Sequence, residues 1–93
     1  MEYKIFVQLT WVIIMKISEA VSKKILCIIK ERDITINKLA TISCLTQSTV
    51  DSLVNGKSKN PKLLTIIRIC DGLGITLKEF FSDEIFLNLD RED

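Results

Sequence analysis

Apolar residues recur at intervals of three and four along most of this chain, the spacing that places them on one face of a helix. Between residues 18 and 32 this face consists of Val21, Ile25, Ile28 and Ile29. Similar stripes predict helices over residues 35–42 and 46–56, another from residue 60 to residues 72–74, and a short one from residue 76 that contains Phe80 and Phe81. The pattern therefore predicts a compact all-α fold of five helices.

Side chains able to cap helices stand at the expected helix starts. The predicted N-caps are Ser18, Thr35, Thr46 and Thr76. For the fourth helix we expect Asn60 as the cap and Pro61 at the first helical position, where the missing proline N–H is not needed. Its core-facing stripe is predicted to be Leu63, Leu64, Ile67 and Cys70, with Leu73 as a further candidate, and Gly72 and Gly74 are expected to end it.

The N-terminal residues follow a different pattern, because every odd position from Tyr3 to Met15 is apolar while Lys4, Gln8 and Thr10 fall between them. A period of two predicts a β-strand, and its unpaired edge could be matched by a second copy in a dimer. Alternatively, the domain starts at Met15 and the residues before it are an extension outside the fold. Both interpretations stay open. The chain is thus divided into an extension (1–15), a helical domain (16–82) and an acidic tail (83–93).

Charge is distributed unevenly along the 93 residues, although the formal net charge is only +1. Residues 15–81 hold 11 Lys/Arg against 6 Asp/Glu, a net charge of +5. Residues 82–93 hold Arg91 against 5 acidic residues, a net charge of −4. The helical part is therefore the part expected to meet a polyanion such as nucleic acid.

The chain offers little for catalysis or metal binding. It has no His, no CxxC pair and no Gly-rich phosphate loop. The three cysteines, Cys27, Cys44 and Cys70, are therefore expected to be buried free thiols in a reducing cytoplasm. No apolar run reaches the roughly 18 residues that a membrane span requires. We expect no enzyme activity, no metal, no cofactor, no membrane and no small-molecule ligand.

Three segments in a fixed order carry a family resemblance. They are I-T-I-N-K-L-A (residues 34–40), L-T-Q-S-T-V-D-S-L-V-N-G-K-S-K-N-P (45–61) and L-G-I-T-L-K-E-F-F (73–81). Together they resemble the XRE-type, phage-repressor-like (Cro-like) helix-turn-helix family. The resemblance implies a five-helix domain that binds double-stranded DNA, often as a dimer. We therefore expect a sequence-specific transcriptional regulator, most simply a dimeric repressor.

The resemblance also assigns site residues. The residues that match the family's groove-facing positions are Gln47, Ser48, Thr49 and Ser52. The residues that match its backbone-gripping loop are Asn55, Lys57, Lys59 and Asn60. Thr35, at the start of the helix over residues 35–42, resembles the family's phosphate site at a helix N-terminus, and Lys38 could add charge there. An amide such as Gln47 can both donate to and accept from adenine in the major groove.

The sequence departs from the family pattern in three places. Cys44 stands in the turn where Gly is common, so that the turn is expected to differ slightly or to carry strain. Ile36 replaces a Gln that often clamps phosphate. Ile29 and Val54 jointly replace a buried Arg–Glu pair of some relatives. A second function class stays open as well: a protein-interaction module, antitoxin-like or adaptor, that keeps the fold and binds a protein.

Overall fold

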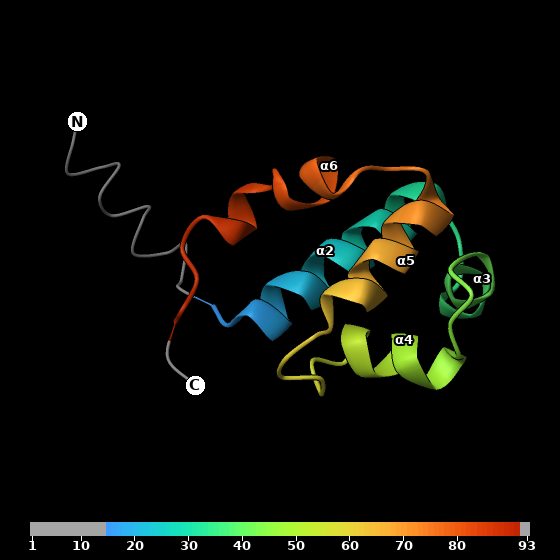
Figure 1. Ribbon diagram of the computed structural model, residues 1–93, viewed down its shortest axis with the longest axis horizontal. Helices are drawn as coiled ribbons and strands as arrows, with labels where there is room; N and C mark the ends of the chain where they lie inside the picture. The colour runs from blue at the N-terminus through green and yellow to red at the C-terminus, as the bar shows by residue number, and fades with distance from the viewer. Residues whose placement is uncertain (1–14, 92–93) are drawn as a thin grey trace.

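The computed structural model describes residues 15–91 (Figure 1). These residues form five α-helices and one short 3-10 helix, and no extended strand occurs among them. The elements are α2 (Ile17–Arg32), α3 (Ile36–Ile42), α4 (Gln47–Val54), α5 (Leu63–Leu73), α6 (Leu77–Phe81) and η1 (Glu84–Phe86). The predicted all-α, five-helix fold is confirmed.

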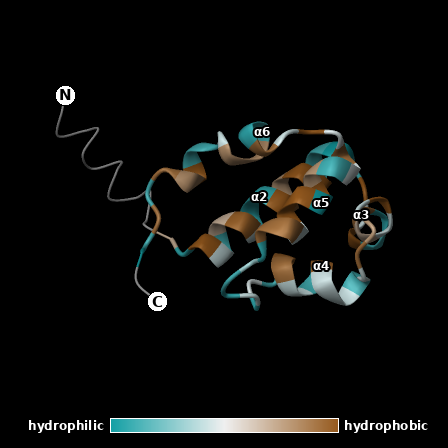
Figure 2. Ribbon diagram, in the orientation of Figure 1, coloured by the Kyte–Doolittle hydropathy of each residue, from teal (hydrophilic) through white to brown (hydrophobic). Residues whose placement is uncertain are grey.

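The helices pack around a single core. α4 packs against α2 and α3, α3 also packs against α5, and α6 and η1 pack on α5 and α2 respectively. The most hydrophobic ribbon belongs to α5, in the middle of the molecule (Figure 2). The largest fully buried side chains are Phe80, Ile25, Leu39, Ile69, Val21, Val50 and Cys70. Each comes from an apolar stripe, so burial follows from the helical spacing.

All three predicted threonine caps are confirmed by their hydrogen bonds. The hydroxyl of Thr35 accepts from the Lys38 N–H at 3.0 Å, and that of Thr46 accepts from the Thr49 N–H at 3.1 Å. Thr76 forms a reciprocal pair with Glu79, whose carboxylate accepts from the Thr76 N–H at 2.8 Å. These bonds satisfy backbone donors that have no partner inside the helix.

The predicted start of the first helix is wrong. α2 begins at Ile17, with Lys16 as the N-cap, and Ser18 does not cap it. The Lys16 N–H donates instead to the Glu19 carboxylate at 3.0 Å. Ser18 is the second residue of the helix and is buried. A carboxylate at the third helical position thus satisfies the terminal donor that Ser18 was expected to serve.

The predicted start of the fourth helix is also wrong, and its predicted apolar face is correct only at Cys70 and Leu73. α5 begins at Leu63 with Lys62 as the N-cap, so that Asn60 and Pro61 lie in the preceding loop. Leu63 and Leu64 are 58% and 56% exposed. The core-facing residues of α5 are Ile66, Ile69, Cys70 and Leu73. The first turn of the helix extends beyond the edge of the core, which the spacing of the leucines does not reveal.

Gly72 was expected to end α5 but lies inside it, and the helix ends at Gly74, which has a φ of 72°. Gly72 faces the end of α3: a Cβ built on it would lie 2.6 Å from the carbonyl oxygen of Ile42 and 2.9 Å from its carbonyl carbon. Backbone atoms cannot swing away as a side-chain tip can. The absence of a side chain at Gly72 therefore allows α5 to approach α3 closely.

We expect Gly72→Ala to destabilise the fold by a net amount on the order of 1 kcal/mol. Overpacking against the backbone of Ile42 costs roughly 1–3 kcal/mol, and the better helix propensity of alanine returns up to about 1 kcal/mol. Urea unfolding of the purified protein measures the difference. Asp71→Ala, at the exposed neighbouring position of α5, is the control. A Gly72→Ala protein more stable than the Asp71→Ala protein would contradict the close approach.

The C-terminal segment returns to the start of α2. η1 packs on α2, and the Asp83 carboxylate accepts from the Ile85 N–H at 3.1 Å and from the Lys24 ammonium at 3.3 Å. The Ile85 hydrogen bond, more than Lys24, lowers the pKa of Asp83. Beyond η1, Met15 and Leu89 form an isolated parallel bridge. The proposed strand over residues 3–15 falls almost entirely outside the described residues.

The cysteine prediction holds at one position. Cys70 is buried, and burial raises the pKa of its thiol. Cys27 and Cys44 are exposed, which corrects the expectation that all three are buried. Cys27 lies outside the apolar stripe of α2, and Cys44 lies in the turn between α3 and α4. No helix within residues 15–91 is long and apolar enough to cross a membrane.

Candidate nucleic-acid interface

The turn between α3 and α4 is made without glycine. Cys44 adopts a left-handed backbone with a φ of 57°, a conformation that glycine adopts more easily than other residues. The turn is closed by the Leu45 N–H, which donates to the Ala40 carbonyl at 2.9 Å. The expected strain is therefore present at Cys44, as a modest conformational cost of a side chain at this position.

α4 separates apolar from polar side chains by its helical period. Val50, Leu53 and Val54 are buried on the inner side. On the outer side Gln47 and Ser48 are exposed, and Thr49 and Ser52 are half-buried. The four predicted base-reading residues thus occupy the first part of one helix, which lies along the lower edge of the molecule in Figure 1.

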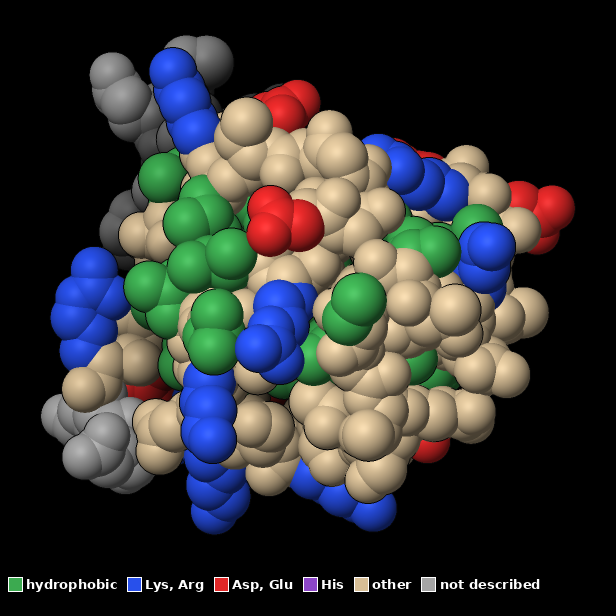
Figure 3. Space-filling model, turned by 45° about the vertical axis from the view of Figure 1, so that its right-hand side comes forward, with side chains coloured by type: hydrophobic (Ala, Val, Ile, Leu, Met, Phe, Trp, Pro, Cys, Tyr) green, Lys and Arg blue, Asp and Glu red, His purple; other side chains and the backbone are tan. Residues whose placement is uncertain are grey.

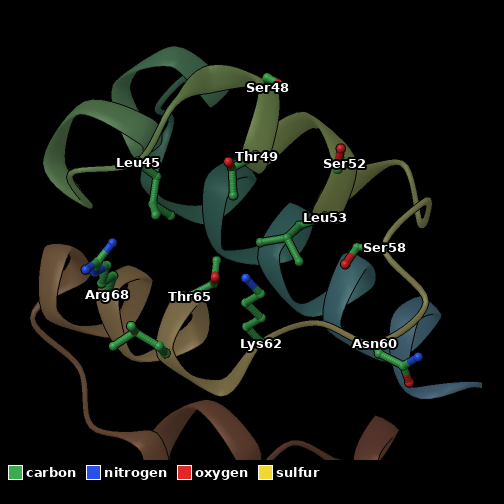
Figure 4. A pocket seen from close by; sticks show the side chains of 11 residues that line it. Leu45, Ser48, Thr49, Ser52, Leu53, Ser58, Asn60, Lys62, Thr65 and Arg68 are labelled. Atoms are coloured by element: carbon green, nitrogen blue, oxygen red, sulfur yellow. The ribbon is translucent and has the colours of Figure 1, made fainter.

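The hydroxyls of these residues are not equally free. The Thr49 hydroxyl shares a 2.9 Å hydrogen bond with that of Thr46, the cap of α4. Ser48 and Ser52 point outward from α4 (Figure 4). Gln47 and Ser48 are therefore best placed to contact a ligand outside α4, whereas Thr49 is partly committed to its own helix.

The loop after α4 is basic and exposed. Gly56 has a φ of 69° and lets the chain reverse, and the Lys57 N–H donates to the Ser52 carbonyl at 3.0 Å. Lys57, Lys59 and the amides of Asn55 and Asn60 are all exposed. The loop thus presents charge beside α4.

The start of α3 forms a separate part of the candidate surface. Thr35 and Lys38 are exposed there, but the Thr35 hydroxyl already accepts from the Lys38 N–H. Ile36, which replaces the phosphate-clamping Gln of relatives, packs against the core. The replacement of a buried Arg–Glu pair is accommodated in the same way, since Val54 is buried in the core and Ile29 packs against it.

A groove of about 480 Å³ runs between α4 and the first half of α5 (Figure 4). It brings together four of the predicted site residues, Ser48, Thr49, Ser52 and Asn60. The other predicted site residues do not line it; they are Gln47, Asn55, Lys57, Lys59, Thr35 and Lys38. The surface predicted from sequence therefore consists of a groove and of flanking positions outside it.

The groove also contains polar residues that sequence reasoning missed. They are Ser58, Lys62, Thr65 and Arg68. Three of them recur every third residue, at 62, 65 and 68, which places them on one side of α5 and its cap. The spacing is present in the sequence. The predicted core-facing stripe began with Leu63 and Leu64, however, and so gave no indication that this side of the helix faces a groove. On the face turned forward in Figure 3, basic side chains are spread among uncharged ones, and acidic side chains lie near its middle and at its edges.

Comparison with known proteins agrees with this geometry. A family model described as the Cro/C1-type HTH DNA-binding domain matches residues 24–84, from the middle of α2 to η1. The chain belongs to this family. No curated protein and no solved structure gives a significant match. As a Cro/C1-type domain the chain is a non-enzymatic binding module, and the partner that its family implies is DNA.

Proposed function

We propose that this Cro/C1-type domain is a sequence-specific, double-stranded DNA-binding transcriptional regulator of the cytoplasm, most simply a dimeric repressor. The observation that supports this best is the two-sided character of α4. Its inner side is buried, while Gln47 and Ser48 are exposed at its start. An amide and a hydroxyl that are exposed at the N-terminal end of a helix can form hydrogen bonds with the edges of bases in a major groove.

In this proposal the groove-facing residues of α4 and the loop after it have different roles. Gln47, Ser48, Thr49 and Ser52 would contact bases, and the Gln47 amide would pair with the N6 and N7 atoms of an adenine. Lys57, Lys59, Asn55 and Asn60 would hold the sugar–phosphate backbone, together with Thr35 and Lys38 at the start of α3. The phosphate contacts position the helix, and the base contacts supply the sequence preference.

The proposed dimer follows from the symmetry of duplex DNA. Two copies related by a two-fold axis would place their α4 helices in successive major grooves, about 34 Å apart along the duplex. Leu63 is 58% exposed at the start of α5 and adds apolar area on which a second copy could pack. Sedimentation of the protein with and without a selected duplex determines whether two copies bind together.

The phosphate role of the loop has a direct test. We expect Lys57→Ala to weaken binding to selected and random duplexes by the same factor, because a phosphate contact carries no sequence information. The slope of log Kobs against log salt should become shallower by about 0.9. Fluorescence anisotropy at several salt concentrations measures both quantities. A loss confined to the selected duplex would show that Lys57 contacts a base, not phosphate.

A protein-interaction module is the second candidate, and one observation favours it. Leu87 is 71% exposed just after η1, and such a side chain can anchor a protein partner. A gel shift against random duplex DNA at low and high salt separates the two functions. Salt-sensitive binding supports the DNA-binding regulator, and the absence of binding even at low salt supports the interaction module.

A further inference from the structure

The groove between α4 and α5 has the chemistry of an anion site. Its polar lining consists of hydroxyls, one amide and the cations of Lys62 and Arg68. None of the described residues that line it carries a carboxylate. Within residues 15–91 neither Lys62 nor Arg68 forms a salt bridge. Two cations that face a groove free of opposing charge favour an anionic ligand.

The two cations are spread along the groove (Figure 4). The Arg68 side chain lies near Leu45, at the end next to the turn between α3 and α4. The Lys62 ammonium points into the groove near Thr65 and Leu53, closer to the basic loop. This arrangement suits an extended ligand with repeated negative charges better than a single compact anion.

The apolar residues that line the groove restrict further which kinds of ligand can fit it. Leu45, Leu53 and Leu64 line the groove together with the hydroxyls, and Leu64 is 56% exposed. A ligand that fits must therefore present apolar surface as well as charge. A sugar–phosphate chain does so, because each phosphate is followed by a largely apolar deoxyribose.

We propose that this groove holds the sugar–phosphate backbone of one DNA strand beside α4, with Lys62 and Arg68 as its phosphate contacts. The proposal rests on the proposed function and adds a role for α5. The backbone would be gripped on the α5 side of α4, in addition to the loop side. Contacts on both sides restrict how far α4 can rotate in the major groove of the DNA. They orient Gln47 without reading sequence themselves.

Lys62→Gln and Arg68→Gln test the proposal, with Lys78→Gln on α6 as the matched control. All three residues are exposed, and each change removes one positive charge. Circular dichroism melting establishes that each variant is folded. We expect each groove variant to flatten the salt dependence of duplex binding by about 0.9 in log–log slope. Selected and random duplexes should weaken equally, and the Lys78→Gln slope should equal that of the wild type.

Duplexes with one chemically modified phosphate test which phosphate Lys62 contacts. A methylphosphonate at one position replaces a charged phosphate by a neutral group. At the phosphate held by Lys62, the modification should weaken wild-type binding but leave Lys62→Gln binding almost unchanged. Scanning the substitution along one strand identifies that phosphate. If no position removes the difference between wild type and Lys62→Gln, the groove does not hold a backbone phosphate and the proposal is wrong.

The remaining outcomes separate this proposal from the function on which it rests. If the wild type binds duplex DNA but the groove variants keep the slope of Lys78→Gln, the groove proposal fails and the proposed function stands. If the wild type binds no duplex at any salt concentration, the proposed function itself fails. If inorganic phosphate saturates the groove in an NMR titration while the groove variants leave DNA binding unchanged, the site serves a free anion and the backbone assignment is overturned.

Discussion

Replacing Phe80 by alanine is expected to lower the free energy of unfolding by about 3–5 kcal/mol. Phe80 is fully buried in the core and is the largest side chain there. Its ring contacts Phe81 with a centroid distance of 4.9 Å and Phe86 with one of 5.8 Å. The substitution leaves a cavity in the core and removes both ring contacts, one of which joins α6 to η1.

Urea unfolding at 25 °C, followed by circular dichroism, measures this loss. Leu87→Ala is the control, because Leu87 is 71% exposed and its truncation should change stability by less than about 0.5 kcal/mol. The total stability of a domain of this size is only about 5–15 kcal/mol, so Phe80→Ala should leave a marginally folded protein. Equal effects of the two substitutions would contradict the placement of Phe80 in the core.

Gln47→Ala should remove the preference for one base pair and weaken binding to the favoured duplex by about 1–3 kcal/mol. Gln47 is exposed at the first position of α4 and is not among the buried residues of that helix. Truncation should therefore leave the core and the loop contacts unchanged. Binding to random DNA, which depends on phosphate contacts, should stay nearly the same.

Competition binding against duplexes that vary one base pair at a time measures the preference directly. Asn88→Ala is a suitable control, because it removes an exposed amide from the C-terminal segment and not from α4. The control should keep the full preference at every position. If Gln47→Ala also keeps it, the amide does not read a base, and Ser48 becomes the next residue to test.

The parts of the fold that were predicted correctly are those set by local chemistry. The caps at Thr35, Thr46 and Thr76 depend on a hydroxyl and an N–H only three residues apart. The buried face of α4 depends on helical spacing alone. The family resemblance implied that these helices form a five-helix domain. Each of these properties can be recognised from neighbouring residues in the sequence.

The parts that were missed depend on where the core ends. Leu63 and Leu64 looked like core residues, yet the first turn of α5 extends past the core. Cys27 and Cys44 looked like buried thiols, yet one lies on an outer face and the other in a turn. The contribution of Lys62 and Arg68 to the groove required knowing that α5 lies beside α4. Such placements are decided by tertiary packing, which a single sequence does not specify.

The central claim is that α4 reads the major groove of a DNA duplex, and selection of bound duplexes from a random library tests it most directly. For the wild type we predict enrichment of two inverted half-sites with centres about 10 base pairs apart. For Gln47→Ala we predict the same spacing with one position in each half-site no longer defined. A library that shows no enriched sequence, or one whose enriched sequence is unaffected by Gln47→Ala and Ser48→Ala, would contradict the claim.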